Sequence, residues 1–248
     1  MFNKLKKSKI IFHPTITGLD EVMPIIPTSS YVHAWKTEDI KKFNEKKCIF
    51  ANKPKATAKC PGINTLHSKG WIVRTWQDLA IITNGDGKSI SWKSPLDQSS
   101  IDTDRNQSIS FHTSENFESM KNFPMNTNAN AIKFNAGWRC KIPKGYILYQ
   151  LPFFNSDENR FTTIAGAYSY KMGIATLNIP VYWHVQNDTT LIKAGTPIAQ
   201  LILVPETDVD FELSKIDNNE IAVNNILLSN QFITNYNNMK QYWKDKMQ

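Results

Sequence analysis

The chain has 248 residues, of which 41% are hydrophobic and 21% are charged, and its formal net charge is +7 at pH 7. This composition excludes an intrinsically disordered chain, and no apolar run of the sequence approaches the ~20 residues of a membrane-spanning helix. The positive charge favours an acidic partner, although net charge describes long-range attraction and not a particular site.

The cysteines and the amino terminus both predict a protein that is not exported. The three cysteines are an odd number without CxxC or Cys/His ligand spacing, which argues against a disulfide framework and a zinc site. After the basic start "MFNKLKKSK", only Ile10-Ile11-Phe12 precede His13-Pro14, so the apolar segment of a signal peptide is missing. We therefore expect a reducing compartment.

Residues 1–62 are rich in Lys and Pro and predict a basic, largely irregular N-terminal arm. One short helix is expected near residues 37–46, with Thr37 as its N-cap. The lysine clusters "KLKKSK" and "IKKFNEKK" predict either a weak attraction for nucleic acid or only a solvated face. They lack the regularly interleaved aromatic residues of a platform that binds single strands.

A β domain is predicted over residues 63–213. It begins with the β-branched and aromatic runs "WIVRTW", "DLAIITN" and "SISWKS", and the turn sequence "NGDG" separates the last two. A polar excursion follows at 95–130, in which only residues 108–112 resemble a strand. Further strand-like segments lie between residues 138 and 204. Many short strands separated by Gly, Pro and Asn predict a sandwich or barrel.

The tail from 214 to 248 has the period of one helix face, because apolar residues recur at intervals of three or four. A C-terminal α-helix is therefore expected. Its many asparagines are poor helix formers, so packing must stabilise it, either on its own β domain or on a neighbouring subunit. The expected interface residues are Leu228, Phe232, Tyr236, Met239 and Trp243.

Two turn-and-strand motifs carry a family resemblance. The first is "IPKGYILYQLP" at 142–152, and the second is "IKAGTPIAQLILVP" at 192–205. Together they resemble motifs of the dUTPase and dCTP deaminase superfamily, over roughly residues 71–206. The resemblance implies a β-clip fold, which is a mainly β barrel or sandwich. It also implies a homo-oligomer, with a trimer favoured because that fold commonly assembles in this way.

Four residues of these motifs are expected to have structural roles. Gly145 marks the first turn, and Gly195 supplies a turn conformation that is closed to other residues. Pro197 enters a strand where no ladder donor is needed. Gln200 is the single polar residue of an apolar run, and a buried amide without partners costs about 1–3 kcal/mol. We therefore expect Gln200 to hydrogen-bond backbone groups where strands cross.

The positions that carry catalysis in the resembled family are replaced here. Its hydrolases have a Ser-containing phosphate motif where this chain has "PFFN" (152–155), and a water-activating Asp where it has "AGAYSYKMG" (165–173). A tyrosine cannot act as a general base at neutral pH without a large pKa shift. No catalytic residue and no cofactor is therefore expected, and the ligand-binding candidates are Tyr168, Tyr170 and Lys171.

Two further patterns match known sites only in part. Asp102, Asp104 and Asn106 stand at the first three liganding positions of a calcium loop, but the loop's Gly and its final Glu are missing. A metal site there is the alternative, and no site is the expectation. Cys60 precedes Pro61-Gly62 and lies near His67 in the sequence, which fits a thiol nucleophile or simply a tight turn.

Loss of the catalytic positions together with retention of the fold's turns predicts a non-enzymatic structural or interaction protein. The alternative is a nucleotide-binding or nucleotide-hydrolysing enzyme with a rearranged site. The segment "KCPGINTLHSKGWIVRTW" resembles uncharacterised phage proteins and a related bacterial domain family. This resemblance implies a phage origin and a location in the host cytoplasm or in the virion.

Overall fold

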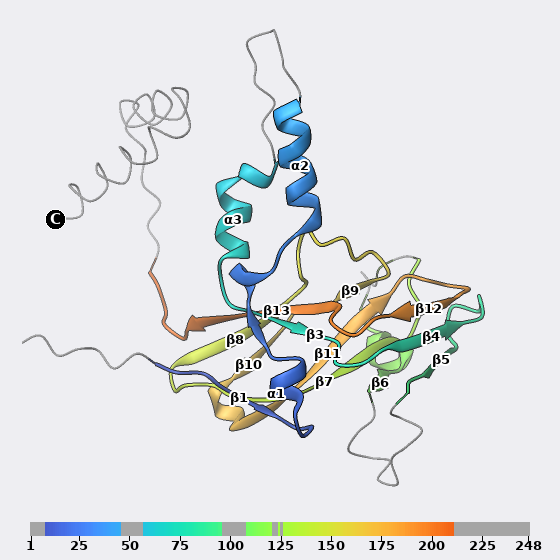
Figure 1. Cartoon of the computed structure of the whole chain (residues 1–248). Coiled ribbons are helices and arrows are strands. Elements are labelled where there is room, and N and C mark those ends of the chain that lie inside the picture. Colours follow the sequence, from blue (N-terminus) through green and yellow to red (C-terminus); the bar gives the residue numbers. More distant parts are fainter. Residues whose placement is uncertain (1–7, 46–56, 96–107, 121–123, 125, 211–248) are drawn as a thin grey trace, which may run out of the picture. The chain divides into compact units, whose positions relative to one another are not determined.

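The computed structural model describes residues 8–45, 57–95, 108–120, 124 and 126–210. The chain divides into two compact units, Met1–Glu206 and Thr207–Gln248, and all the elements named below belong to the first unit (Figure 1). The helix predicted for 214–248, with its five expected interface residues, lies outside the described residues. The same is true of the calcium-like positions Asp102, Asp104 and Asn106.

The first sheet is built on two long antiparallel strands, β7 and β11. Along β11 buried side chains alternate with more exposed ones, so one face of the strand joins the core and the other faces outward. A β-bulge between Thr176 and Asn178 shifts the pairing of β11 with β7. The sheet order is β1-β7-β11-β9, and β6 also pairs with β7. The strands are β1 (Ile11–Pro14), β6 (Ile109–His112), β7 (Ala131–Lys141), β9 (Phe161–Thr163) and β11 (Ile174–Trp183).

Two more antiparallel sheets complete the β part of the unit. Their orders are β10-β8-β13-β3-β2 and β12-β4-β5. The strands are β2 (Ile26–Pro27), β3 (Trp71–Arg74), β4 (Leu79–Thr83), β5 (Ile90–Lys93), β8 (Tyr146–Leu151), β10 (Gly166–Ser169), β12 (Thr189–Ile192) and β13 (Pro197–Pro205).

One cluster of buried apolar side chains connects the three sheets. It includes Val73 of β3, Ile81 of β4, Phe134 of β7 and Leu201 of β13. The predicted runs form strands, and "NGDG" joins β4 to β5 as expected. The mainly β fold class predicted from the sequence is therefore confirmed. The remaining short elements are the 3-10 helices η1 (Thr28–Ser30), η3 (Ser114–Phe117) and η4 (Tyr170–Met172).

Residues 11–27 differ from the irregular arm that the sequence predicted. Strand β1 pairs with β7, and β2 pairs with β3. Between them lies the short helix α1 (Leu19–Val22), whose Leu19 is 2% exposed and belongs to the core. Strands this short show no alternating pattern in the sequence. They form because β7 and β3 present unpaired backbone groups to them.

A helical unit projects from the sheets and consists of α2 (Ala34–Glu45), η2 (Thr57–Lys59) and α3 (Pro61–His67) (Figure 1). Helix α2 begins at Ala34, so the prediction that Thr37 is its N-cap was wrong. Pro61 starts α3 and does not form an isolated turn, because its fixed φ suits the first position of a helix. Hydrogen bonds within the unit join Lys36 to Asn64 (3.0 Å), Asn64 to Ala58 (3.1 Å) and Ala58 to Asp39 (2.8 Å).

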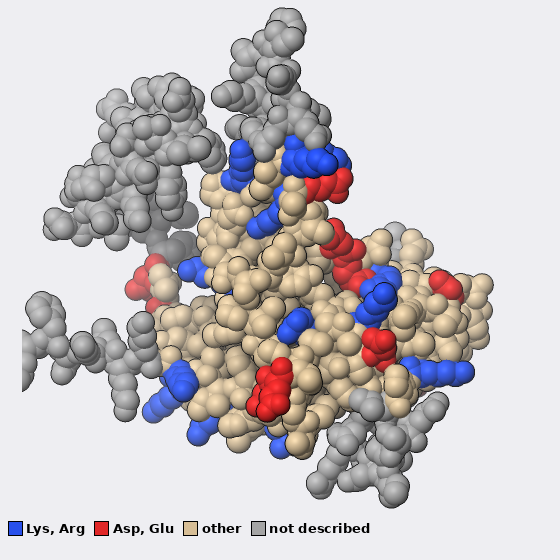
Figure 2. Space-filling model, in the orientation of Figure 1, with Lys and Arg blue, Asp and Glu red and all other residues tan. Residues whose placement is uncertain are grey.

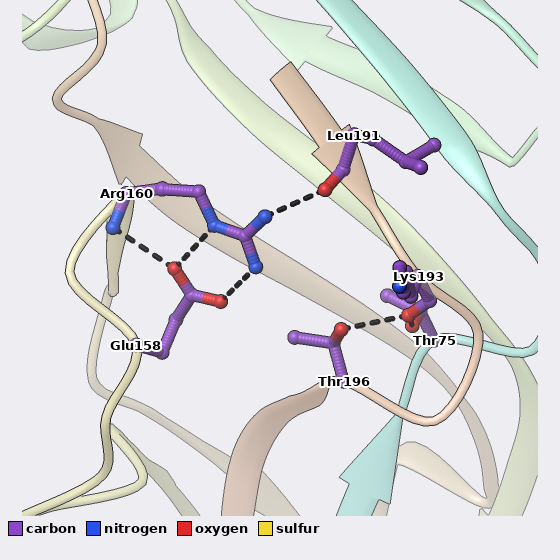
Figure 3. Close-up of polar contacts among 6 residues, drawn as sticks. All are labelled: Thr75, Glu158, Arg160, Leu191, Lys193 and Thr196. Carbon is purple, nitrogen blue, oxygen red and sulfur yellow. Dashed lines mark hydrogen bonds and ion pairs between the residues drawn. The ribbon is translucent and has the colours of Figure 1, made fainter.

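The turn before β13 has the left-handed backbone that its glycine suggested. Gly195 has a φ of 87°, and its amide donates to the Thr75 carbonyl at 2.8 Å. The hydroxyls of Thr75 and Thr196 both donate to the Lys193 carbonyl, at 2.8 and 2.7 Å (Figure 3). Pro197 then begins β13 at an irregularity in its pairing with β3, so no ladder hydrogen bond is lost.

Gln200 attaches the helical unit to β13. Its side chain is fully buried, and its Nε2 donates to the carbonyls of Leu66 and Lys69 at 2.9 and 2.8 Å. These carbonyls lie at the end of α3 and just beyond it, where a helix leaves acceptors unpaired. The sequence predicted that Gln200 binds backbone groups where strands cross. Its partners are instead carbonyls at the end of a helix. Gly145, with a φ of 80°, forms the turn before β8.

Candidate ligand-binding site

A chain of polar contacts joins β8, β10 and β11 at the segment 165–173. The Tyr168 hydroxyl donates to Gln150 Oε1 at 2.9 Å and lies 3.1 Å from the Asn178 carbonyl oxygen. Gln150 is 2% exposed and donates its Nε2 to the Ile164 carbonyl at 3.0 Å. Asn178 follows the β-bulge of β11, a feature that often re-aims side chains near functional sites.

A cavity of about 290 Å³ lies beside Tyr168. This volume is close to the lower end of the roughly 300–1,000 Å³ that small-molecule sites occupy. Residues 164–168, which include the start of β10, line part of the cavity, and strands β6, β7, β8 and β11 supply the other lining residues. The polar side chains that line the cavity are His112, Lys133, Gln150, Tyr168, Thr176 and Asn178.

The electrostatics of this cavity favour binding of a polar or negatively charged group. Burial lowers the pKa of His112, and the charge of Lys133 lowers it further, so the imidazole is neutral at pH 7. Burial raises the pKa of Tyr168 to about 12; the Cys140 thiol acts in the same direction, and the hydrogen bond to the Asn178 backbone opposes them. The phenol therefore stays protonated. Among the described lining residues there is a lysine and no carboxylate.

The structure separates the three predicted ligand-binding residues. Tyr168 lines the cavity, whereas Tyr170 and Lys171 are not among its lining residues. Tyr170 packs against the hydrophobic core. Lys171 Nζ lies 5.7 Å from the centre of the Tyr170 ring and 3.7 Å from Glu206 Oε1. A role of Tyr170 and Lys171 in binding stays a prediction.

Sequence reasoning missed five of the six polar lining residues, and four of the five illustrate two different reasons. Gln150 interrupts the apolar run "YILYQLP" as Gln200 interrupts its own run, so the same pattern could have identified it. Asn178 interrupts "IATLNIPVYW" in a similar way. His112 and Lys133 carry no such signal, because only the pairing of β6 with β7 brings them together.

The cysteine and histidine patterns do not form a second site. Cys60 is exposed and precedes α3, while His67 ends that helix, which separates them by about 10 Å along the axis. Burial raises the pKa of Cys140 to about 11, so its thiol stays protonated. Within the ranges that the structure describes, no three His, Cys, Asp or Glu side chains are grouped to hold a metal ion. No helix in those ranges has the length and apolar character of a membrane span.

No protein-family model and no curated protein sequence matches this chain. Solved structures that it resembles are phage dUTPases, members of the superfamily whose motifs the sequence resembles. The dUTPase of Staphylococcus bacteriophage 80alpha is 12% identical, with a TM-score of 0.31, over 68% of this chain and 92% of that chain. The dUTPase from phage phi11 of S. aureus is 11% identical, with a TM-score of 0.32, over 68% and 92%. TM-scores this low carry no information about a site, so function has to be inferred from this chain's own residues.

Proposed function

We propose that this chain acts by binding and not by catalysis, as an interaction protein of phage origin. The observation that supports this most is the environment of Tyr168. In the family that the sequence motifs resemble, the corresponding hairpin carries a water-activating Asp. Here the hairpin carries a phenol that is hydrogen-bonded to Gln150 and lies beside the Asn178 carbonyl.

The groups around the cavity fit binding better than hydrolysis. Hydrolysis of a nucleoside triphosphate needs a deprotonated water, Mg²⁺ held by carboxylates, and donors placed around the developing charge. Loss of even one such preorganised group usually costs ~10²–10³ in rate. The described lining groups are an amine, an imidazole, amides and hydroxyls. These groups bind polar ligands, but Mg²⁺ prefers carboxylate oxygens.

A pyrophosphate-release assay with dUTP and Mg²⁺ tests this proposal on the purified full chain. We expect no turnover above background, with an active dUTPase as the positive control in the same assay. A kcat of about 1 s⁻¹ or more, which is the scale of ordinary enzymes, would overturn the proposal.

Nucleotide binding without turnover is the second candidate, and Lys133 is the observation that favours it. A lysine beside a cavity can pair with a phosphate, and hydrogen bonds to charged groups contribute about 1.5–3 kcal/mol. The Lys133→Met substitution should therefore weaken dUMP binding by roughly 10-fold or more in calorimetry. Lys171→Met is the matched control, because that lysine does not line the cavity. An equal loss in both variants would show that the attraction is not specific to the cavity.

We also propose that the chain forms a homo-oligomer, with a trimer favoured by analogy to the resembled family, in the host cytoplasm or in the virion. Light scattering at micromolar concentration should then give a multiple of the 28.4 kDa chain mass. A monomer would argue against this assembly. Mass spectrometry of purified virions distinguishes the two locations, because only a virion component remains with the particles.

A further inference from the structure

Two buried histidines stack face to face where the helical unit meets the sheets. The rings of His33 and His67 have centroids 4.0 Å apart and an interplanar angle of 12°. His33 also stacks on Phe153, with a centroid distance of 5.1 Å and an angle of 25°. The histidines are 5% and 4% exposed. These three residues are called the histidine stack below.

The histidine stack connects three separate segments. His33 immediately precedes α2, His67 is the last residue of α3, and Phe153 lies in the loop after β8. One nitrogen of the stack has a partner, because His67 Nε2 lies 3.1 Å from the Phe154 carbonyl oxygen. Both nitrogens of His33 and Nδ1 of His67 are buried without a hydrogen-bond partner. An imidazolium has two N–H donors that need acceptors, so this environment suits the neutral rings.

The charge that acts on both rings is positive. Burial is the largest cause that lowers the pKa of His33, to about 4, followed by the charges of His67 and Lys36. Burial also lowers the pKa of His67; the hydrogen bond to the Phe154 backbone opposes this effect, and Lys36 adds to it. A proton on either ring would therefore place a charge in a buried stack that already lies near a lysine.

The other groups around the stack do not compensate such a charge. Tyr31 and Trp35 flank His33 with their rings, at centroid distances of 5.2 and 6.1 Å. On α2, the Asp39 carboxylate already accepts the Ala58 amide at 2.8 Å. In the loop after β8, the charge of Asp157 acts on Tyr31, as does that of Arg74. In Figure 2 the middle of the surface between the helical projection and the sheets is uncharged, whereas acidic and basic residues lie along the right side of this junction.

We propose that the histidine stack is a proton-operated latch. Near neutral pH the uncharged rings pack together and hold the start of α2 against the loop after β8. Protonation of the pair introduces like charges into the stack, and the rings separate.

Among the described residues, helix α2 is hydrogen-bonded to α3 and η2, by Lys36 to Asn64 and by Ala58 to Asp39, but not to the sheets, so the α2 side of the latch is the side that moves. The end of α3 is held on β13 by Gln200, which donates to Leu66 and Lys69. Gly70 also fixes this end, because a Cβ added there would collide with the Leu201 carbonyl oxygen, so the two backbones lie very close together. The segment that contains His33 and α2 has no such anchor to β13 among the hydrogen bonds of the described residues.

Release of α2 would widen the cavity that lies beneath it. This cavity of about 410 Å³ lies between α2, the start of η2 and the loop after β8. Trp35 and Asp39 line it from α2, and Asn155 and Asp157 line it from the loop. Acid would therefore control access to these side chains as well as the position of the helix.

Hydrogen–deuterium exchange of the full chain at pH 7.5 and pH 5.0, corrected for intrinsic rates, tests the latch. With a pKa of about 4 in the closed state and about 6.5 in the open state, acidification should raise the opening constant on the order of 10- to 30-fold. We expect peptides from residues 31–45 to gain exchange at pH 5.0. Peptides from β7 and β11 should keep their protection.

His33→Phe is the decisive variant, because a phenyl ring can stack on Phe153 but cannot take up a proton. We expect it to abolish the pH response of residues 31–45, whereas His13→Gln, on the exposed β1, should respond as the parent chain does. An unchanged pH response in His33→Phe would overturn the proposal, since titrating carboxylates would then explain it.

If His33→Phe does not fold, an NMR titration of the unmodified chain tests the same proposal. The C2 proton of His33 should titrate in NMR with a pKa well below 6.5, together with exchange broadening of α2 resonances. A pKa near 6.5, or a titration that leaves α2 unchanged, would overturn the latch.

Discussion

The β sheets and the helical unit differ in what holds them in place. One apolar cluster joins the three sheets, and antiparallel ladders such as that of β7 with β11 extend along their length. The loop before β9 is also tied to a strand. Arg160 binds Glu158 at 2.5 and 2.8 Å and donates to the Leu191 carbonyl of β12 at 2.6 Å (Figure 3). The helical unit instead meets the sheets through the side chain of Gln200 and the histidine stack.

This difference shows that burial alone does not make two regions equally stable. The apolar cluster stabilises the sheets across the neutral and acidic range, because its side chains are aliphatic or aromatic apart from Cys140, whose raised pKa of about 11 keeps the thiol protonated there. The Nε2 of Gln200 is buried with two partners and its Oε1 with none, whereas neither ring nitrogen of His33 has a partner. We therefore expect the helical unit to open before the sheets do, and the substitutions below separate the two regions.

The largest effect is expected for a core residue of the first sheet. Phe134 is 1% exposed and its ring lies 5.6 Å from that of Phe161. Phe134→Ala should lower the free energy of unfolding by about 3–5 kcal/mol, because it removes apolar contacts and leaves a cavity. Urea denaturation measures the change. Ile174→Ala, at a side chain that is 56% exposed, is the control and should change stability by far less. A small loss in Phe134→Ala would contradict the view that the core dominates.

A smaller effect is expected at the junction of the two regions. Gln200→Leu removes the donor to the Leu66 and Lys69 carbonyls; Leu66 keeps the Lys69 amide at 3.2 Å, whereas the Lys69 carbonyl loses its donor, which should cost about 1–3 kcal/mol. Hydrogen exchange should increase at residues 61–70 more than in β7. Gln186→Leu is the matched control, because that glutamine is only half-buried and its amide makes a long contact of 3.3 Å to the Asn126 carbonyl. Uniform loss of protection in all strands would show that the helical unit is not a separate cooperative region.

The contribution of the histidine stack to global stability should appear as a difference in pH dependence between the parent chain and His33→Phe. The pKa of His33 is about 4 in the folded chain, below its unfolded value near 6.5, so the folded state prefers the neutral ring. This contribution is complete above about pH 6.5 and is lost as the pH falls towards 4. Between pH 7.5 and 5.0 we expect the parent chain to lose on the order of 1–2 kcal/mol more than His33→Phe. Equal losses in paired urea titrations would assign the pH dependence to other groups.

The smallest effect is expected for an exposed ion pair. Lys171 Nζ lies 3.7 Å from Glu206 Oε1, and the lysine side chain is 68% exposed. Lys171→Ala should change the free energy of unfolding by less than about 0.5 kcal/mol, because exposed ion pairs contribute little. Thermal unfolding at low and high salt measures this. A loss above 1 kcal/mol would show that η4 contributes more to stability than its exposure suggests.

The long strands of the sheets could be predicted from the sequence, whereas the short strands and the exact start of α2 could not. Strands β7, β8, β11 and β13 lie within or overlap the predicted runs, because a half-buried strand imposes a period of two on its own sequence. Strands β1, β2 and β12 were missed, because two to four residues are too few to show that period. Helix α2 was found near its true position, but its start was misplaced by three residues, from Ala34 to Thr37.

The candidate site was predictable only in part. The segment 165–173 was singled out, and Tyr168 lines the cavity. Its partner Gln150 follows the same pattern that identified Gln200, a lone amide in an apolar strand. His112 and Lys133 could not be predicted to line one cavity. They come together only because β6 pairs with β7, and the sequence does not show that pairing.

The sequence by itself determined the mainly β class, the left-handed turn at Gly195 and the burial of Gln200, since each follows from the local period or from the conformational freedom of one residue. Only the tertiary structure decided which carbonyls Gln200 binds and that His33 and His67 stack on each other. The physical reason is that these contacts join positions far apart in the chain. No local pattern records such contacts, because the Gln200 bonds form only when α3 packs on β13, and the histidine stack forms only when the start of α2 packs on the end of α3.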